Sequence, residues 1–149
     1  MAKTDSTNFK TSLCVKAAEF AVKKHSGQLD DEGKDYFTAH CMHVFRILGE
    51  VTKDEEILAS GLLHDILEDT DTTYVELELG FGKRVAALVF EVTHAGSKDN
   101  HGFYFPRLVS RDAILLKFAD RLSNLSRMAA WGPRRQEQYL RKSKFWRSE

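Results

Sequence analysis

Apolar residues recur at steps of three and four along most of the chain, and no segment alternates convincingly between apolar and polar positions. This spacing predicts amphipathic α-helices, each with one apolar side that faces a core. The first expected helix covers residues 9–26, and Gly27 can stop it. The polar stretch that follows, residues 28–36, contains a glycine and is expected to form a loop.

The middle of the chain predicts four further helices, over residues 38–49, 52–65, 73–80 and 81–92. Thr38 can cap the first of them. The second and the third each begin with the spacing of a capping box, in which a Thr side chain and a Glu side chain satisfy free backbone N–H groups of the first turn. Gly80 is expected to close the third helix.

The last part of the chain begins with residues 95–103, the longest stretch without a helical period. Such a loop is often a functional lid in a compact domain, and a plain surface linker is the alternative. A short helix over 104–109, a long helix over 111–130 and a basic closing segment over 134–146 are expected to follow. No repeat or linker divides the chain, so we expect one all-α domain of about seven helices over residues 1–149.

The composition suits an ordinary globular domain with one core. Lysine and arginine together number 22, and so do aspartate and glutamate, which gives a net charge of zero. A dedicated nucleic-acid-binding protein would show a basic excess, so no nucleic-acid partner is expected. A local basic pocket remains compatible with this balance.

The cysteines and the hydropathy of the chain indicate its cellular location. The two cysteines, Cys14 and Cys41, lie in helix-like segments and suit free thiols in a reducing compartment. Residues 1–12 are too polar for a signal peptide, and no run of about 18 apolar residues is present that would cross a membrane. We therefore expect a cytoplasmic protein without a membrane partner.

One stretch concentrates candidate chemistry: residues 61–73, which read GLLHDILEDTDTT. Four titratable groups lie within six residues, 64–69, beside aliphatic side chains, where burying a charge is costly unless it is paired or bound to a metal. Neighbouring residues on a helix diverge by about 100°, so the side chains of His64 and Asp65 cannot point the same way, yet they could flank one divalent ion. The alternative is a buried His–Asp pair satisfied by hydrogen bonds.

Two further motifs change this picture: FTAH at residues 37–40 and LKFADRLSNL at residues 116–125. Histidine, then histidine–aspartate, then aspartate, in this order, resembles the HD-domain metal-dependent phosphohydrolase superfamily. Within it, the HD-E-DT-T string with LKxADxLxNL resembles the hydrolase domain of RelA/SpoT-type enzymes. It is most similar to the small stand-alone guanosine 3′,5′-bis(diphosphate) 3′-pyrophosphohydrolases, over about residues 17–139.

The resemblance implies a metal site whose four ligands are His40, His64, Asp65 and Asp120. Two imidazoles and two carboxylates without a thiolate suit manganese, iron or zinc, and the family implies Mn²⁺. Four protein ligands around an octahedral ion would leave about two positions for water or a phosphate oxygen, and a bound metal lowers the pKa of water from about 15.7 toward about 7. The alternative is that Asp120 pairs with Lys117 or Arg121 and that His40 lies at the surface.

The resemblance also implies groups for proton transfer and for substrate binding. Glu68 and Asp69 are the implied catalytic pair, which on a continuing helix would lie one turn beyond Asp65; a solvated acidic helix end is the alternative. A pyrophosphate ester needs cations and hydrogen-bond donors, although each cation also suits a solvated surface position. The candidates for substrate binding are Lys23, Lys24, Lys98, Arg121, Asn124, Arg135 and Tyr139.

The chain departs from the family pattern near His40. The resembled enzymes have tyrosine three residues before this histidine and proline directly after it, where this chain has Phe37 and Cys41. Their preceding loop is basic, whereas residues 29–35 (LDDEGKD) are mostly acidic and would repel an anion at the mouth of a site. His43, one turn beyond His40, is absent from the motif and is given no role.

Together these features predict a metal-dependent enzyme that acts on a small nucleotide. The first hypothesis is hydrolysis of the 3′-pyrophosphate of guanosine bis(diphosphate) to GDP or GTP and pyrophosphate. The acidic loop favours the second, hydrolysis of another phosphoester such as a deoxynucleoside monophosphate or NADPH. The third is a non-catalytic nucleotide-binding module, against which the pair Glu68 and Asp69 argues. The metal's identity and the oligomeric state stay open.

Overall fold

The computed structural model describes residues 2–93 and 108–142, and within these ranges the chain forms helices and no β-strand. One isolated antiparallel bridge, from Leu29 to Asp35, closes the loop after the first helix. The all-α prediction is confirmed. The elements are α1 (Ala2–Lys24), the π-helix η1 (Phe37–Cys41), α2 (Met42–Gly49), α3 (Glu55–Leu63), α4 (Ile66–Asp69), α5 (Tyr74–Phe81), α6 (Lys83–Val92), α7 (Arg111–Ser126), the 3₁₀ turn η2 (Met128–Ala130) and α8 (Pro133–Lys142).

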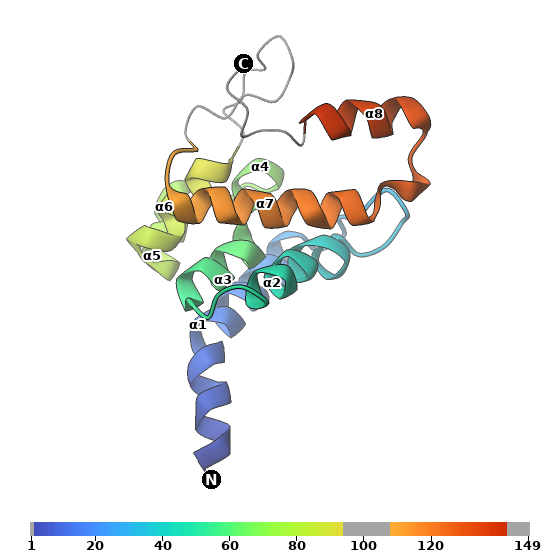
Figure 1. Ribbon diagram of the computed structural model, residues 1–149. Helices are drawn as coiled ribbons and strands as arrows, with labels where there is room; N and C mark the ends of the chain where they lie inside the picture. The colour runs from blue at the N-terminus through green and yellow to red at the C-terminus, as the bar shows by residue number, and fades with distance from the viewer. Residues whose placement is uncertain (1, 94–107, 143–149) are drawn as a thin grey trace.

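Helix α3 forms the centre of the fold (Figure 1). It packs against α1, α2, α6 and α7, and every residue from Ile57 to Leu63 is buried. A helix that is apolar on all sides needs such a surrounding of other elements. Gly61 allows α2 to come close, because a Cβ at this position would lie 2.6 Å from Leu48 Cδ1. The packing thus carries the end of α3, directly before His64, into the middle of the molecule.

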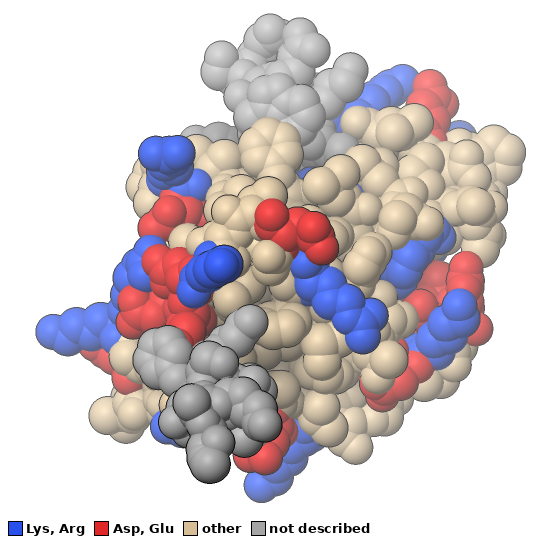
Figure 2. All heavy atoms as spheres, turned by 60° about the horizontal axis from the view of Figure 1, so that its bottom comes forward, with Lys and Arg blue, Asp and Glu red and all other residues tan. Residues whose placement is uncertain are grey.

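Arg84 on α6 ties three helices together by ion pairs. Its guanidinium lies 2.7–2.9 Å from carboxylates of Asp54 and Glu56 at the start of α3 and of Asp112 on α7. Charges of both signs are also interspersed on the face shown in Figure 2, where Lys and Arg side chains lie beside Asp and Glu side chains. This mixing accords with the net charge of zero.

The sequence predicts two capping boxes, and the structure confirms the second. Thr73 Oγ1 accepts from the N–H of Glu76 at 3.1 Å, and Glu76 Oε1 accepts from the N–H of Thr73 at 2.9 Å. The prediction of a capping box at residues 52–55 is wrong. Asp54 caps α3 instead, because its carboxylate accepts from the N–H groups of residues 56 and 57.

Two other predicted helix ends also differ. Thr38 does not cap the second helix, since its N–H and hydroxyl donate to the Asp35 carboxylate inside a π-helix that already begins at Phe37. Gly80 does not end α5. The helix continues to Phe81, and Gly82 follows as its C-cap. Gly82 has φ +95°, a conformation that L side chains rarely take.

The C-terminal part agrees with the prediction in outline. Helix α7 ends at Ser126 instead of residue 130, and a 3₁₀ turn replaces its expected last turn. Helix α8 starts at Pro133, a favoured first helical residue. Residues 95–103 and most of the expected helix over 104–109 lie outside the described residues, so the choice between lid and linker stays a prediction. Among the helices described, none has the length and apolarity needed to cross a bilayer.

Candidate metal centre

Helix α3 ends directly before His64, the backbone leaves helical geometry at Asp65, and this break shapes the site. Helix α3 ends at Leu63, and α4 begins anew at Ile66. Between them Asp65 has φ −97° and ψ 3°, in a sparsely populated region that active-site residues often occupy. His64 Nε2 lies 3.0 Å from Asp65 Oδ2. The two side chains thus flank one point, as the sequence allows for a divalent ion, although the expected continuous helix is interrupted here.

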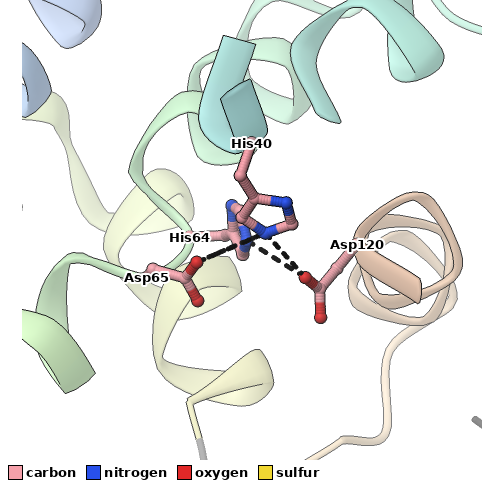
Figure 3. A group of neighbouring side chains, drawn as sticks. All are labelled: His40, His64, Asp65 and Asp120. Carbon is pink, nitrogen blue, oxygen red and sulfur yellow. Dashed lines mark hydrogen bonds and ion pairs between the residues drawn. The ribbon is translucent and has the colours of Figure 1, made fainter. Parts of the chain in front are cut away.

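Four side chains from three parts of the chain converge on one point (Figure 3). His40 lies in η1, His64 and Asp65 at the break after α3, and Asp120 on α7. His40 Nε2 lies 3.0 Å from His64 Nε2, 3.4 Å from Asp65 Oδ2 and 3.0 Å from Asp120 Oδ1. His64 Nε2 lies 3.3 Å from Asp120 Oδ1, and all four ligand atoms lie within 4.8 Å of one another.

This donor set fits a divalent metal ion. Neighbouring ligands at about 2.1 Å from an ion lie about 3.0 Å apart in octahedral and about 3.4 Å apart in tetrahedral coordination. The five spacings given above span the same interval, 3.0–3.4 Å. Hydrogen bonds alone explain the cluster less well, because the single Nε2 proton of His40 cannot serve three neighbours with good geometry. Two imidazoles and two carboxylates suit manganese, iron or zinc.

The site is buried, and its surroundings favour the ionised form of both carboxyl groups. His40, His64 and Asp120 are buried, and the Asp65 side chain is 16% exposed. Burial raises the pKa of the Asp65 carboxyl, but the charge of His64 and hydrogen bonds from both histidines outweigh it and hold that pKa well below its usual range. Burial acts on the Asp120 pKa in the same way and is outweighed first by the charge of Lys117, so this pKa also lies well below its usual range. Both groups are therefore suited to hold a cation.

The alternative to a metal site is that Asp120 pairs with a basic neighbour and that His40 lies at the surface. The first part is right and the second is wrong. Asp120 does pair with Lys117, whose Nζ lies 3.2 Å from Asp120 Oδ2. The second carboxylate oxygen, Oδ1, faces His40 and His64, so one carboxylate makes both kinds of contact. His40 is fully buried and does not lie at the surface.

Each histidine is oriented through its other ring nitrogen. His64 Nδ1 lies 2.8 Å from the carbonyl oxygen of Gly61, which can only accept. Nδ1 therefore carries a proton, and Nε2 would offer its lone pair to a bound ion once its own proton is released. His40 Nδ1 lies 3.0 Å from Ser123 Oγ, which also lies 3.0 Å from His43 Nδ1. Ser123 thus links His43, which sequence reasoning gave no role, to a predicted ligand.

Tyr36 contacts Asp65, the one predicted ligand that is partly exposed. Its hydroxyl donates to Asp65 Oδ2 at 2.6 Å, and its ring lies 5.4 Å from the ring of His40. Burial, and then the charge of Asp65, raise the pKa of the Tyr36 phenol well above its usual value, so the hydroxyl stays a donor. The family position for tyrosine holds Phe37 in this chain, and the tyrosine one residue earlier makes this contact.

Glu68 and Asp69 lie at the exposed end of α4. The N–H of Asp69 donates to the carbonyl oxygen of Asp65 at 2.9 Å, which places Asp69 one helical turn beyond that ligand. Gln28 Nε2 donates to Asp69 Oδ2 at 3.1 Å. Burial, and then the charge of Asp65, raise the pKa of the Asp69 carboxyl. The catalytic role of the pair stays a prediction.

Three of the predicted substrate-binding residues come together beside the metal centre. The hydroxyl of Tyr139 on α8 accepts from Arg121 Nη1 at 3.0 Å and from Asn124 Nδ2 at 2.8 Å. The Arg121 guanidinium also lies 5.3 Å from the centre of the Tyr139 ring. Asn124 Nδ2 lies 3.4 Å from Asp120 Oδ1, so this group adjoins the metal centre.

The two predicted lysines that the structure describes, Lys23 and Lys24, are not part of that group. Lys24 pairs with the exposed Asp71 at 3.0 Å. Lys23 is exposed in the last turn of α1. Lys98 lies outside the described residues.

The acidic loop of residues 29–35 is largely neutralised by ion pairs. Its pairs, with nitrogen–oxygen distances of 3.1, 2.7 and 3.1 Å, are Asp30 with Arg127, Asp31 with Arg135, and Glu32 with Lys34. The Arg135 guanidinium also lies 4.0 Å from the centre of the Trp131 ring. The loop therefore presents less negative charge than its sequence suggests.

Sequence reasoning missed four residues that contact the site: Tyr36, Gln28, Ser123 and Arg127. Ser123 stands three residues after Asp120, and this spacing on one helix face could have indicated it. Arg127 Nη2 lies 3.2 Å from His40 Nδ1, from which it is 87 residues distant in sequence. No local sequence pattern predicts a contact between residues so far apart in the sequence.

Comparisons with known proteins agree with the HD-domain resemblance seen in the sequence motifs. The HD domain family matches residues 17–101 of the chain. A guanosine-3′,5′-bis(diphosphate) 3′-pyrophosphohydrolase of Aquifex aeolicus is 42% identical over 118 residues, which are 74% of this chain but only 17% of that protein. The pyrophosphohydrolase MESH1 of Danio rerio is 37% identical over 145 residues, covering 87% of this chain and 79% of MESH1.

A solved structure, that of a metazoan ortholog of SpoT that hydrolyses ppGpp and plays a role in starvation responses, has the same fold. The TM-score is 0.76 at 30% sequence identity, and the match covers 88% of this chain and 81% of the other. Family match, sequence identity and fold confirm the resemblance seen in the motifs: this chain belongs to the HD domain family.

Proposed function

We propose that the chain hydrolyses the 3′-pyrophosphate of guanosine 3′,5′-bis(diphosphate) with Mn²⁺ held by its four clustered ligands. The observation that carries the proposal is the convergence of two imidazoles and two carboxylates at spacings of 3.0–3.4 Å. The names of the Aquifex aeolicus and Danio rerio proteins support this substrate, and so does the hydrolysis of ppGpp by the metazoan ortholog of SpoT. The thiols of Cys14 and Cys41 are buried and form no disulfide, which supports a reducing, cytoplasmic location.

In the proposed reaction, water adds to the phosphorus attached to the 3′ oxygen, and the bond between that oxygen and phosphorus breaks. The products are pyrophosphate and GDP with a free 3′-hydroxyl. A bound divalent ion lowers the pKa of water and neutralises phosphate charge. We assign Glu68 and Asp69 the proton transfers: the pair takes the proton that water gives up, and a proton passes to the leaving 3′ oxygen.

Substrate binding is assigned to donors near the cluster. Arg121 and Asn124 direct N–H groups at one point, the Tyr139 hydroxyl, and a phosphate or nucleoside oxygen can accept from the same donors. Lys23, Lys24, Lys98 and Arg135 are the further cations proposed for the two diphosphates. The ion pairs of Asp30 and Asp31 weaken the argument that the acidic loop favours a less anionic substrate.

The test is release of pyrophosphate from guanosine bis(diphosphate) in the presence of Mn²⁺. We expect pyrophosphate and GDP in equal amounts with Mn²⁺, none after chelation of the metal, and no pyrophosphate from a GDP control. Parallel assays use NADPH and deoxynucleoside monophosphates. Turnover of one of these without release from guanosine bis(diphosphate) would contradict the proposal and support the second hypothesis.

A further inference from the structure

The end of α1 carries a tight turn in which the side chains of His25 and Gln28 meet. Gly27, with φ +86°, reverses the chain, and the N–H of Gln28 donates to the carbonyl oxygen of His25 at 2.9 Å. His25 Nδ1 lies 2.7 Å from Gln28 Oε1. A backbone hydrogen bond and a side-chain hydrogen bond between His25 and Gln28 therefore both stabilise this turn.

The hydrogen bonds of Gln28 have one consistent direction. Its Nε2 donates to Asp69 Oδ2 at 3.1 Å, since a carboxylate only accepts. The amide oxygen consequently faces His25 and accepts from Nδ1–H. The amide is thus fixed at both ends, by a buried imidazole on one side and by a proposed catalytic carboxylate on the other.

The imidazole of His25 is poorly suited to packing alone. His25 is 1% exposed, and its Nε2 atom is buried without a hydrogen-bond partner among the described residues. A buried polar atom of this kind destabilises a fold, and an apolar side chain would fill the space without that disadvantage. The contact that distinguishes histidine from an apolar residue here is the bond from Nδ1 to Gln28.

Gln28 and Tyr36 stand at the two ends of one loop and contact the two ends of α4. The N–H of Tyr36 donates to the carbonyl oxygen of Gln28 at 2.9 Å and closes the loop. Tyr36 reaches Asp65 before α4, and Gln28 reaches Asp69 at its end. Helix α4 has only four residues, too few to be rigid without outside contacts. The loop supplies these contacts.

We infer that Gln28, anchored by His25, is a positioning residue that holds the Asp69 carboxylate in one orientation for proton transfer. The inference rests on the proposed function, in which Asp69 handles a proton. A carboxylate on an exposed helix end otherwise samples several rotamers. A misplacement of about 1 Å in an active site can slow a reaction about 100-fold.

Kinetics of three variants test the inference. Gln28→Met removes both hydrogen bonds, Gln28→Glu retains an acceptor for His25 but has no donor for Asp69, and Ser26→Ala is the control in the same turn. We expect both Gln28 variants to lower kcat by about 10–100-fold while KM and bound Mn²⁺ stay within about threefold of the wild type. The control should keep its kcat. An unchanged kcat in Gln28→Met, or a parallel loss of Mn²⁺, overturns the inference.

A spectroscopic measurement separates this inference from the proposed function. In ¹⁵N-labelled protein with Mg²⁺ in place of Mn²⁺, the side-chain amide protons of Gln28 should exchange more slowly than those of the exposed Gln138. Asp69→Ala should speed their exchange. If this protection is present and wild-type protein turns over none of the substrates, the proposed function fails while the contact stands. Exchange as fast as that of Gln138 overturns the positioning role whatever the activity.

Discussion

Asp120 divides its carboxylate between two partners, since Oδ1 faces the histidines and Oδ2 faces Lys117. Asp120→Asn keeps the size of the side chain and removes its charge. We expect the affinity for Mn²⁺ to fall by more than about 100-fold, beyond the effect of losing a contact outside the ligand set. Competition with a chelator measures it. The control is Asp112→Asn, on the same helix but paired with Arg84. Tight metal binding by Asp120→Asn would exclude the Asp120 carboxylate from the ligand set.

The hydroxyl group of Tyr36 is a second single-residue contact that can be tested. Tyr36→Phe removes the hydroxyl that donates to Asp65 and retains the ring beside His40. Groups that orient a metal ligand usually contribute 10–100-fold to metal affinity, and we expect a loss of about that size. Titration calorimetry with Mn²⁺ provides the measurement, with Tyr74→Phe at the exposed start of α5 as the control. Equal affinities for wild type and Tyr36→Phe would reduce Tyr36 to a packing residue.

At the scale of elements, the close approach of α2 and α3 sets the position of the ligands that follow α3. Gly61→Ala would place a Cβ 2.6 Å from Leu48 Cδ1. Overpacking a core destabilises by about 1–3 kcal/mol, and the better helix propensity of alanine returns about 1 kcal/mol. We therefore expect urea unfolding to show a net loss of about 1 kcal/mol in the free energy of unfolding.

A second variant shows whether that loss arises from the Leu48 contact. In a Leu48→Val background the shorter side chain leaves room for the new Cβ, so Gly61→Ala should be neutral or stabilising there. The difference between the two backgrounds is the coupling energy of the pair. An identical effect in both backgrounds would place the strain elsewhere.

At the scale of the whole molecule, two aspartates of the loop after α1 reach the C-terminal segment. Asp30 meets Arg127 and Asp31 meets Arg135, over 97 and 104 residues of sequence. The second pair is about half exposed on both sides, and such a pair typically contributes at most about 1 kcal/mol to stability. Its influence on an anionic substrate can be larger than its influence on folding.

Opposite effects on KM are therefore expected from the two partners. Asp31→Ala removes a negative charge and releases the Arg135 guanidinium, so KM for guanosine bis(diphosphate) should fall. Arg135→Ala should raise KM, and both effects should weaken at high salt, which screens exposed charges. Steady-state kinetics at low and high ionic strength measure them, with Glu137→Ala on the same helix for comparison. Changes of the same sign in both variants would exclude Arg135 as a substrate contact.

The sequence was informative where a local pattern determines the structure. Apolar spacing predicted the helices, and the motifs named His40, His64, Asp65 and Asp120 before their convergence was visible. It failed where the outcome depends on distant contacts. The break between His64 and Asp65 interrupts an apolar run that looks helical on both sides, and Arg127 meets its partners only after the chain has folded.

Because the four predicted ligands are far apart in the sequence, binding of an ion would be coupled to the folding equilibrium. Residues 40, 64–65 and 120 lie together only in the native state, so the unfolded chain lacks the site. By mass action, free Mn²⁺ at about 100 times its dissociation constant would stabilise the native state by about 2.7 kcal/mol. Calorimetry should show a melting temperature that rises with Mn²⁺ concentration in the wild type and stays constant in Asp120→Asn. Supply of the ion would then regulate the amount of folded protein as well as its turnover.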